Sequence, residues 1–277
     1  MSEHNVSGDI AELERPSTFP KLSAMMRPHR LIIAAVAIGL LVLMAVEMRW
    51  DWLPNYAGML FAGLWVTVAL LIASTVLGLM MAIPLGLAQA AGPVFLAWPA
   101  KIFCTIIRGT PLLLQLWLLY YGLGSLFPGI PGIRETFIWP YLREAWPYGL
   151  VALTLSYAGY EGEVMRGAFA GVPRGELEAA RAYGMGRFTT LRRIWLPRAI
   201  HRALPTLAGE TVVQLKSTPL VATITVIDLY AVVGDIRQST YLTYEPLLFL
   251  ALIYLCLTGV LVGIFRHYEK KIPTRGR

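Results

Sequence analysis

The chain has 277 residues, of which 56% are hydrophobic and 15% charged, and its mean hydropathy is +0.58. Because a soluble domain usually carries about 25% charged residues, this composition excludes an ordinary soluble protein and indicates an integral membrane protein. The formal net charge of +7 would also fit a nucleic-acid-binding protein, unless the basic residues follow a membrane topology.

The first half of the chain contains two apolar runs that are long enough to cross a membrane. A membrane helix needs roughly 20 apolar residues. The first run, LIIAAVAIGLLVLMAVEM at residues 31–48, follows a polar N-terminal segment at residues 1–30. Residues 52–100 contain no charged residue and are too long for one span. Their Pro and Gly residues predict a span over residues 59–87 and a turn over residues 90–98.

The second half of the chain continues the same pattern. A third span is predicted over residues 100–125, although Arg108 interrupts it. Residues 128–146 are rich in Pro, Gly and aromatic residues, which is typical of a loop at a membrane interface. Together with three later apolar runs, the sequence predicts an all-α integral membrane protein with six transmembrane helices, the last three over residues 147–170, 205–229 and 246–265.

The positions of Lys and Arg predict the orientation of these spans. If the N-terminus is inside, the inside segments hold eighteen Lys and Arg residues, whereas the outside loops hold four. Basic residues concentrate in cytoplasmic loops, so both termini of this multi-pass protein are predicted to be cytoplasmic. The net positive charge therefore follows the topology, and we expect no nucleic-acid partner.

The most charged internal block, GELEAARAYGMGRFTTLRRIWLP at residues 175–197, falls on the cytoplasmic side. A helix is predicted over residues 174–184. Glu176 and Glu178 lie in its first turn, where the helix dipole favours negative charge. Gly184 is suited to a left-handed stop at its C-terminus.

This block is predicted to form a pair of short helices that lie across the cytoplasmic face. The second helix is expected over residues 187–195, ending before Pro197, because the residue ahead of a proline disfavours helix. In the first helix, Leu177, Ala180 and Gly184 share one face, and small residues there would let a partner approach closely. The alternative is a basic loop that only enforces the topology.

The spacing within the block resembles the EAA loop of the permeases of ABC importers. Glu-Ala-Ala at residues 178–180 is followed by Gly six residues after the Glu, and Ile-x-Leu-Pro begins ten residues later. In that family the loop forms a coupling helix, which docks in a cleft on an ATPase subunit. The resemblance implies that ATPase coupling is carried by Leu177, Glu178, Ala179, Ala180, Gly184, Ile194, Leu196 and Pro197.

Three further segments resemble the polar amino acid permeases in particular, those for histidine, lysine, arginine, ornithine and the opines. They are residues 108–123, 166–185 and 216–229, and the resemblance covers residues 56–270. It implies a five-helix type I importer core in a bacterial inner membrane, to which the span at residues 31–48 is an addition. The implied partners are a pair of ABC ATPase subunits, a second permease chain, identical or homologous, and a periplasmic or lipid-anchored amino-acid-binding protein.

The sequence contains no motif for chemistry of its own. It has no G-x-x-x-x-G-K-[ST] loop to hold phosphates, so ATP and Mg²⁺ are expected in the partner ATPase and no cofactor in this chain. Cys104 and Cys256 both lie in apolar runs and show no metal-ligand spacing. We therefore expect no catalytic residues and no metal site, and the chain is predicted not to be an enzyme.

Several carboxylates lie at membrane depth, where a charge usually faces a cavity or a partner. Glu163 either pairs locally with Arg166 or Arg108, or lines the transport path and pairs with a cationic amino acid. Glu161 lies two residues earlier, about 200° away around a helix, so the two cannot face one site. Glu210 is a further acid within a span. The substrate-path candidates are Glu163, Gln115, Thr218 and Glu161.

Three functions remain open from the sequence. The first is the permease subunit of an ATP-driven importer that moves a polar, cationic amino acid by alternating access. The second is a self-contained secondary transporter, a class that often shows internal repeats, but neither the RGTP pattern nor the EAA pattern occurs twice. The third is a membrane scaffold, which would need no polar groups along its spans.

Overall fold

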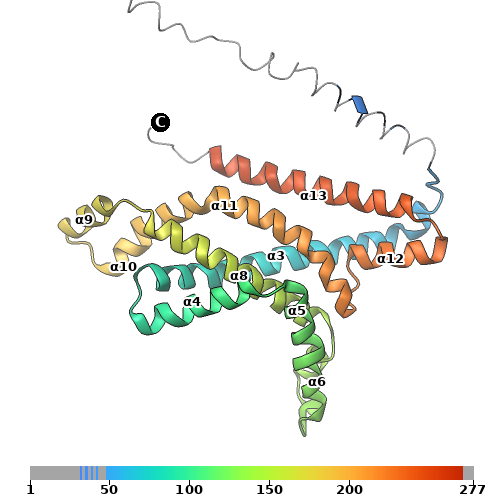
Figure 1. The fold of residues 1–277 in the computed structure, drawn as a ribbon, viewed down its shortest axis with the longest axis horizontal. Helices are drawn as coiled ribbons and strands as arrows, with labels where there is room; N and C mark the ends of the chain where they lie inside the picture. The colour runs from blue at the N-terminus through green and yellow to red at the C-terminus, as the bar shows by residue number, and fades with distance from the viewer. Residues whose placement is uncertain (1–31, 33–34, 37–38, 40–41, 43–47, 271–277) are drawn as a thin grey trace, which may run out of the picture. The chain divides into compact units, whose positions relative to one another are not determined.

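The computed structural model describes residues 32, 35–36, 39, 42 and 48–270 (Figure 1). The chain divides into two compact units, residues 1–50 and 51–277. The predicted N-terminal segment and most of the predicted span at residues 31–48 lie outside the described residues. In the described part of the second unit every regular element is a helix, and the prediction of an all-α membrane protein is confirmed.

Long helices run side by side in the second unit, and shorter ones connect them (Figure 1). The long helices are α3 (Leu53–Ala91), α4 (Val94–Gly109), α8 (Trp146–Ala170), α11 (Leu196–Ser217) and α13 (Tyr244–Lys270). The shorter elements are α5 (Leu112–Trp117), η1 (Leu118–Leu123), α6 (Gly124–Leu126), η2 (Phe127–Gly129), η3 (Ile133–Glu135), α7 (Trp139–Leu142), α9 (Arg174–Ala182), α10 (Arg187–Thr190), η4 (Leu191–Trp195), η5 (Thr218–Ile224) and α12 (Leu229–Thr240). The segment α5–α6 projects steeply from the bundle.

Among the described residues, three helices are long and apolar enough to cross a membrane, and a bent pair supplies a fourth. The three are Leu53–Ala91, Leu112–Gly129 and Tyr244–Glu269, and the bent pair joins Arg187–Ile224 to Leu229–Thr240 at 56°. The boundaries of α8 agree with the predicted span over residues 147–170. The total of six spans stays a prediction.

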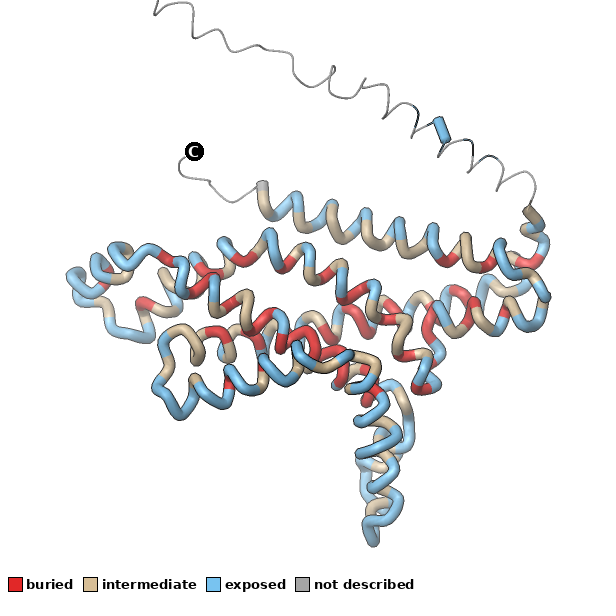
Figure 2. Tube along the Cα trace, in the orientation of Figure 1, coloured by how far each residue is buried: buried red, intermediate tan, exposed pale blue. Residues whose placement is uncertain are grey.

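Close packing of α3 on α8 forms the centre of the bundle. A Cβ on Gly78 would lie 2.8 Å from the Tyr157 ring, and one on Gly86 would lie 2.5 Å from Cβ of Met165. Small residues allow membrane helices to approach this closely. Figure 2 shows the buried residues concentrated along α3, α8 and α11.

The predicted single span over residues 100–125 is wrong. The structure begins α4 at Val94, within the predicted turn over residues 90–98, and ends it at Gly109; α5 then starts at Leu112. Thr110 between them is extended, with φ −113° and ψ 139°. Pro111 causes this break, because the residue before a proline is pushed out of the helical region.

The predicted end of the second cytoplasmic helix before Pro197 is also wrong. The helix continues from Arg187 through Pro197 to Ile224. Residues 191–195 form a π-helical turn, η4, ahead of the proline. The wider π turn shifts the backbone hydrogen bonds, which accommodates a residue that has no N–H to donate. The second half of the charged block and most of the predicted span over residues 205–229 therefore belong to one continuous helix, Arg187–Ile224.

Candidate functional site

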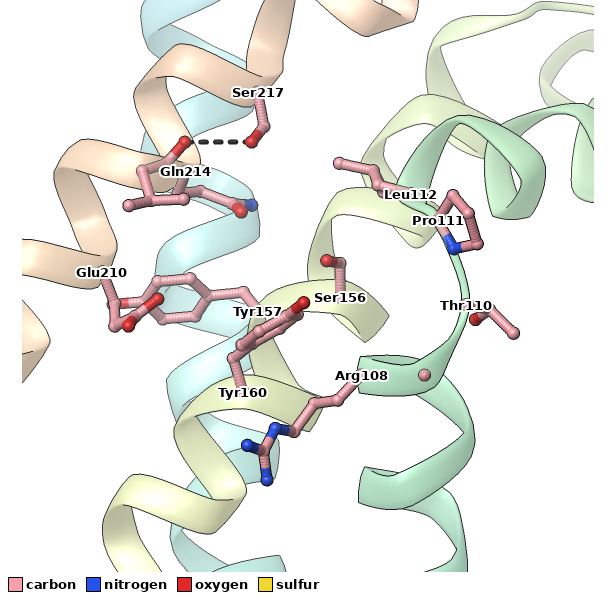
Figure 3. A pocket seen from close by; sticks show the side chains of 12 residues that line it. Arg108, Thr110, Pro111, Leu112, Ser156, Tyr157, Tyr160, Glu210, Gln214 and Ser217 are labelled. Atoms are coloured by element: carbon pink, nitrogen blue, oxygen red, sulfur yellow. Dashed lines mark hydrogen bonds between the residues drawn. The ribbon is translucent and has the colours of Figure 1, made fainter.

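A cavity of about 400 Å³ lies between α4, α5, α8 and α11 (Figure 3). Its walls come from the end of α4, the Thr110–Pro111 break, the middle of α8 and the second half of α11. The volume is within the range of about 300–1,000 Å³ that is usual for small-molecule sites. Its polar lining includes Arg108, Thr110, Ser156, Tyr157, Glu210 and Gln214.

The cavity carries one basic and one acidic side chain. Arg108 lies over the ring of Tyr160, with its Cζ 5.8 Å from the ring centroid. Glu210 extends from α11, and in Figure 3 the rings of Tyr157 and Tyr160 lie between it and Arg108. No described basic side chain forms an ion pair with Glu210. The cavity therefore offers opposite charges at separate places, with aromatic rings between them.

The back wall of the cavity is held by buried hydrogen bonds. Gln214 Nε2 donates to Oγ of Ser74 and to the carbonyl of Leu153, both at 3.0 Å. These bonds join α11 to α3 and α8. The Tyr157 and Thr211 hydroxyl oxygens are 2.9 Å apart. Since Thr211 already donates to the Leu207 carbonyl, Tyr157 is the donor of this pair.

Gln115, one of the substrate-path candidates, holds the break at the rim of the cavity. Its Nε2 donates to the carbonyl oxygens of Ile107 and Thr110, at 2.9 and 3.1 Å. These acceptors belong to the last turn of α4 and to the extended residue ahead of Pro111. Gln115 therefore fixes the backbone next to Arg108 and is not part of the cavity lining.

Glu163 makes the local ion pair that was one of its two alternatives. Arg166 Nε donates to Glu163 Oε1 at 2.7 Å, one turn further along α8. Thr218 is buried at the start of η5, where it donates to the carbonyl of Leu215 and lies 3.2 Å from the Tyr254 hydroxyl. Neither residue lines the cavity. A role of these two residues in the transport path stays a prediction.

Glu161 lies on the opposite side of α8 from that ion pair. Its side chain is fully buried, whereas that of Glu163 is 30% exposed. The expectation that the two carboxylates face different sites is confirmed. The structure thus brings Arg108 and Glu210 together at one cavity and leaves the four sequence candidates outside its lining. The sequence signal that could have identified Arg108 and Glu210 is that each is a charged residue within a predicted span.

Helix α9, which was predicted to be cytoplasmic, ends as its sequence predicts. Gly184 has a φ of +74°, and the amide of Met185 donates to the carbonyl of Ala180 at 3.0 Å. The amide of Gly184 donates to the carbonyl of Arg181 at 2.9 Å. These two bonds form a Schellman motif, in which a left-handed residue satisfies the last carbonyl groups of the helix. Glycine is favoured here because it has no Cβ.

The face of α9 that was expected to receive a partner instead packs largely on the chain itself. Ala180 is 3% exposed, and Leu177 packs against a buried cluster that includes Phe169 and Val172. The spacing showed which residues share a face, but it could not show what that face contacts. The Gly184 end of this face remains exposed, with no atom within 4 Å of an added Cβ.

A different side of the charged block at residues 175–197 is accessible. Glu178 and Ala179 are exposed on α9, Tyr183 is 88% exposed at its end, and Phe188 on α10 is 73% exposed. We call these four residues the α9–α10 surface. Ile194, Leu196 and Pro197, which the EAA spacing also includes, are half-buried. Two exposed aromatic side chains beside a charged helix are typical of a protein contact.

Helix α9 is joined to α11, and the start of α11 is joined to α8; both α11 and α8 line the cavity. Arg198 Nε on α11 lies 2.9 Å from Oε2 of Glu176 on α9. Trp195 Nε1 donates to the carbonyl of Phe169 at 3.0 Å, and the two rings pack edge to face at 5.5 Å. These bonds connect the end of α8 with the start of α11. A displacement of α9 would therefore reach the cavity walls.

Among residues 48–270, no group of three or more His, Cys, Asp and Glu side chains is arranged to hold a metal ion.

A family model described as the binding-protein-dependent transport system inner membrane component matches residues 74–273. The chain is 37% identical over 210 residues to the octopine transport system permease protein OccM of Rhizobium radiobacter, covering 76% of this chain and 84% of that protein. It is 36% identical over 228 residues to the histidine/lysine/arginine/ornithine transport system permease protein HisM of Salmonella typhimurium, covering 82% of this chain and 95% of that protein.

Solved structures give the same picture of the fold. A crystal structure of an amino acid ABC transporter with histidines superposes with a TM-score of 0.67 at 29% identity, over 81% of this chain and 100% of that chain. An inward-facing structure of the MetNI methionine ABC transporter superposes with a TM-score of 0.60 at 17% identity, over 78% of this chain and 97% of that chain. The second likeness concerns the fold alone.

Proposed function

The chain belongs to the family of binding-protein-dependent transport system inner membrane components, and we propose that it is the permease subunit of an ATP-driven importer for a cationic amino acid. Two relatives at 36–37% identity are named for octopine and for basic amino acids, which supports this substrate class. The resemblance of the EAA block to a coupling helix supports an ATP-driven mechanism.

In this proposal the cavity between α4, α5, α8 and α11 receives the amino acid. An amino acid carries a carboxylate and an ammonium group, and a cationic one adds a second positive charge. The Arg108 guanidinium can bind the carboxylate of the amino acid through charge-assisted hydrogen bonds. The Glu210 carboxylate can bind a positively charged group of the amino acid in the same way. The pairing of these opposite charges in one cavity is the observation that carries the proposal. Gln115 has a positioning role beside Arg108.

The α9–α10 surface docks on the ATPase in this proposal. Two ATPase subunits bind ATP and Mg²⁺ and hydrolyse ATP, and this chain supplies neither the nucleotide site nor a catalytic residue. When the ATPases close, they move α9, and the Glu176–Arg198 and Trp195–Phe169 contacts pass the movement to α11 and α8. The cavity then alternates between the two sides of the membrane.

The other partners follow from the same family. A second permease chain, identical or homologous, completes the pore, and a periplasmic or lipid-anchored binding protein delivers the amino acid. The complex resides in the inner membrane, with the termini and the α9–α10 surface on its cytoplasmic side.

The test is to purify the tagged chain gently from native membranes and to identify co-purifying proteins by mass spectrometry. We expect a nucleotide-binding subunit to co-purify with the wild-type chain but not with Ala179→Trp. The bulky ring would lie on the exposed side of α9 and block docking there. The matched control, Ala179→Ser, changes the same site without bulk and should retain the partner. A chain that purifies alone and catalyses ion-driven uptake would instead be a secondary transporter.

A further inference from the structure

Helix α11 exposes a charged side chain inside its predicted span. Lys216 is exposed, and no acid in the described part of the chain forms an ion pair with it. It lies eleven residues after Pro205, where the predicted span begins, which is roughly 16 Å along the helix. Because the hydrocarbon core of a membrane is about 30 Å thick, Lys216 lies near its middle. A lysine at that depth is costly against lipid and usually faces a cavity or another protein.

The other exposed helix faces suit lipid. Residues 246–265 of α13 contain no charged residue, and their exposed side chains include Leu252, Leu255 and Val260. Lys101 on α4 is also exposed, but it follows closely after the predicted turn at residues 90–98. A lysine so near the end of a span extends its ammonium group to the lipid headgroups. Lys216 has no such route, so the side of α11 that carries it must contact something other than lipid.

Four exposed residues define this side of α11. Pro205, Gly209, Val213 and Lys216 follow one another at spacings of four, four and three residues, which places them on one side of the helix. We call these four residues the α11 face. A Cβ added to Gly209 would meet no atom within 4 Å. Helices α8 and α13 pack on other sides of α11, so the α11 face is free to receive a partner over about three turns.

The cavity between α4, α5, α8 and α11 opens beside the α11 face. Val213 lines the cavity and is nevertheless 55% exposed, and Tyr160 on α8 is an exposed lining residue as well. Glu210 and Ser217, which flank Val213 along α11, line the same cavity (Figure 3). Lipid cannot satisfy polar groups, so a polar cavity at membrane depth needs protein or water on every side. The described part of the chain supplies no wall on the side of Val213.

We propose that a second permease chain packs on the α11 face, closes the cavity there and pairs an acidic side chain with Lys216. This inference rests on the proposed function, which supplies the second chain. A helix of that chain gives the cavity its missing wall. A carboxylate on the same helix neutralises Lys216 through a charge-assisted hydrogen bond, so that neither charge is left alone at membrane depth. The two chains then share the lining of the substrate cavity.

The first part of the test is photo-cross-linking in the complete importer in native membranes. Val213→p-benzoyl-L-phenylalanine puts a photoreactive group on the α11 face, and mass spectrometry identifies what it captures. We expect a peptide of the second permease chain. The same photoreactive residue in place of Leu255, which is 69% exposed on α13, is the matched control and should capture no permease chain.

The second part measures how much Lys216 contributes to the association of the two permease chains. Removing one partner of a buried charge pair raises a dissociation constant by roughly thirtyfold or more. Lys216→Met should show this increase in a dilution series of the detergent-solubilised complex, and it should still insert because methionine is more apolar than lysine. Lys216→Arg keeps the charge and should retain most of the affinity. Lys101→Met is the matched control and should leave the dissociation constant unchanged.

The remaining outcomes overturn the inference. Capture from position 255 but not from position 213 would put the second chain on α13 and leave the proposed function standing. Capture of residues 31–48 of the same chain from position 213 would show that its own N-terminal segment covers the α11 face. Equal dissociation constants for the wild type and Lys216→Met would rule out the ion pair. Absence of any second permease chain from the wild-type complex would refute this inference together with the proposed pairing of permeases.

Discussion

Replacing Gly184 with Ala tests how α9, the proposed coupling helix, is held in shape. Gly184 has a φ of +74°, and a Cβ added there would meet no atom within 4 Å. The substitution therefore creates no clash in this chain, and its effect comes from the backbone conformation alone. A left-handed residue other than glycine costs roughly 1–2 kcal/mol, so the population of α9 with an intact C-terminus should fall by about 5- to 30-fold relative to the frayed form.

The assay is substrate-stimulated ATP hydrolysis by the complete importer in lipid vesicles. We expect Gly184→Ala to lower the stimulated rate while leaving the basal rate and the amount of assembled complex unchanged. Asparagine tolerates the left-handed region better than alanine, so the larger variant Gly184→Asn should be the less impaired of the two. If Asn is more harmful than Ala, side-chain size at the proposed ATPase contact decides the outcome and the conformational argument is wrong.

Three further predictions concern the transmembrane part. Glu210→Gln should weaken arginine binding by about tenfold or more in equilibrium binding, since a hydrogen bond to a charged group contributes roughly 1.5–3 kcal/mol; an equal loss of binding of citrulline, the neutral counterpart of arginine, would contradict an ionic role. Glu163→Gln should lower uptake of cationic amino acids more than that of neutral ones if Glu163 lines the path, whereas equal effects would leave it with only the structural ion pair seen here. Gly86→Ala should lower the free energy of unfolding by roughly 1–3 kcal/mol, because the added Cβ would lie 2.5 Å from the Cβ of Met165. Gly167→Ala is the control, because a Cβ added at this position on α8 would meet no atom within 4 Å. It should be neutral or stabilising, since Ala favours a helix more than Gly does.

Local rules were enough to predict the class of the protein and helix α9. The length of the apolar runs indicated membrane helices, and the predicted helix over residues 174–184 agrees with α9 and its left-handed stop at Gly184. Each of these features depends on residues within one or two turns of one another. The break before Pro111, which divides the predicted third span, obeys a local rule of the same kind.

The tertiary structure decided which helix faces meet. Leu153 is fully buried, whereas Leu255 is 69% exposed, although both lie within long apolar helices. Because lipid is as apolar as a protein core, hydropathy does not distinguish a residue that faces lipid from one that faces another helix. For that reason the sequence did not reveal that Arg108 and Glu210 line one cavity, or that Ala180 packs against its own chain. Those contacts depend on how segments far apart in the sequence pack together, which helical periodicity alone does not specify.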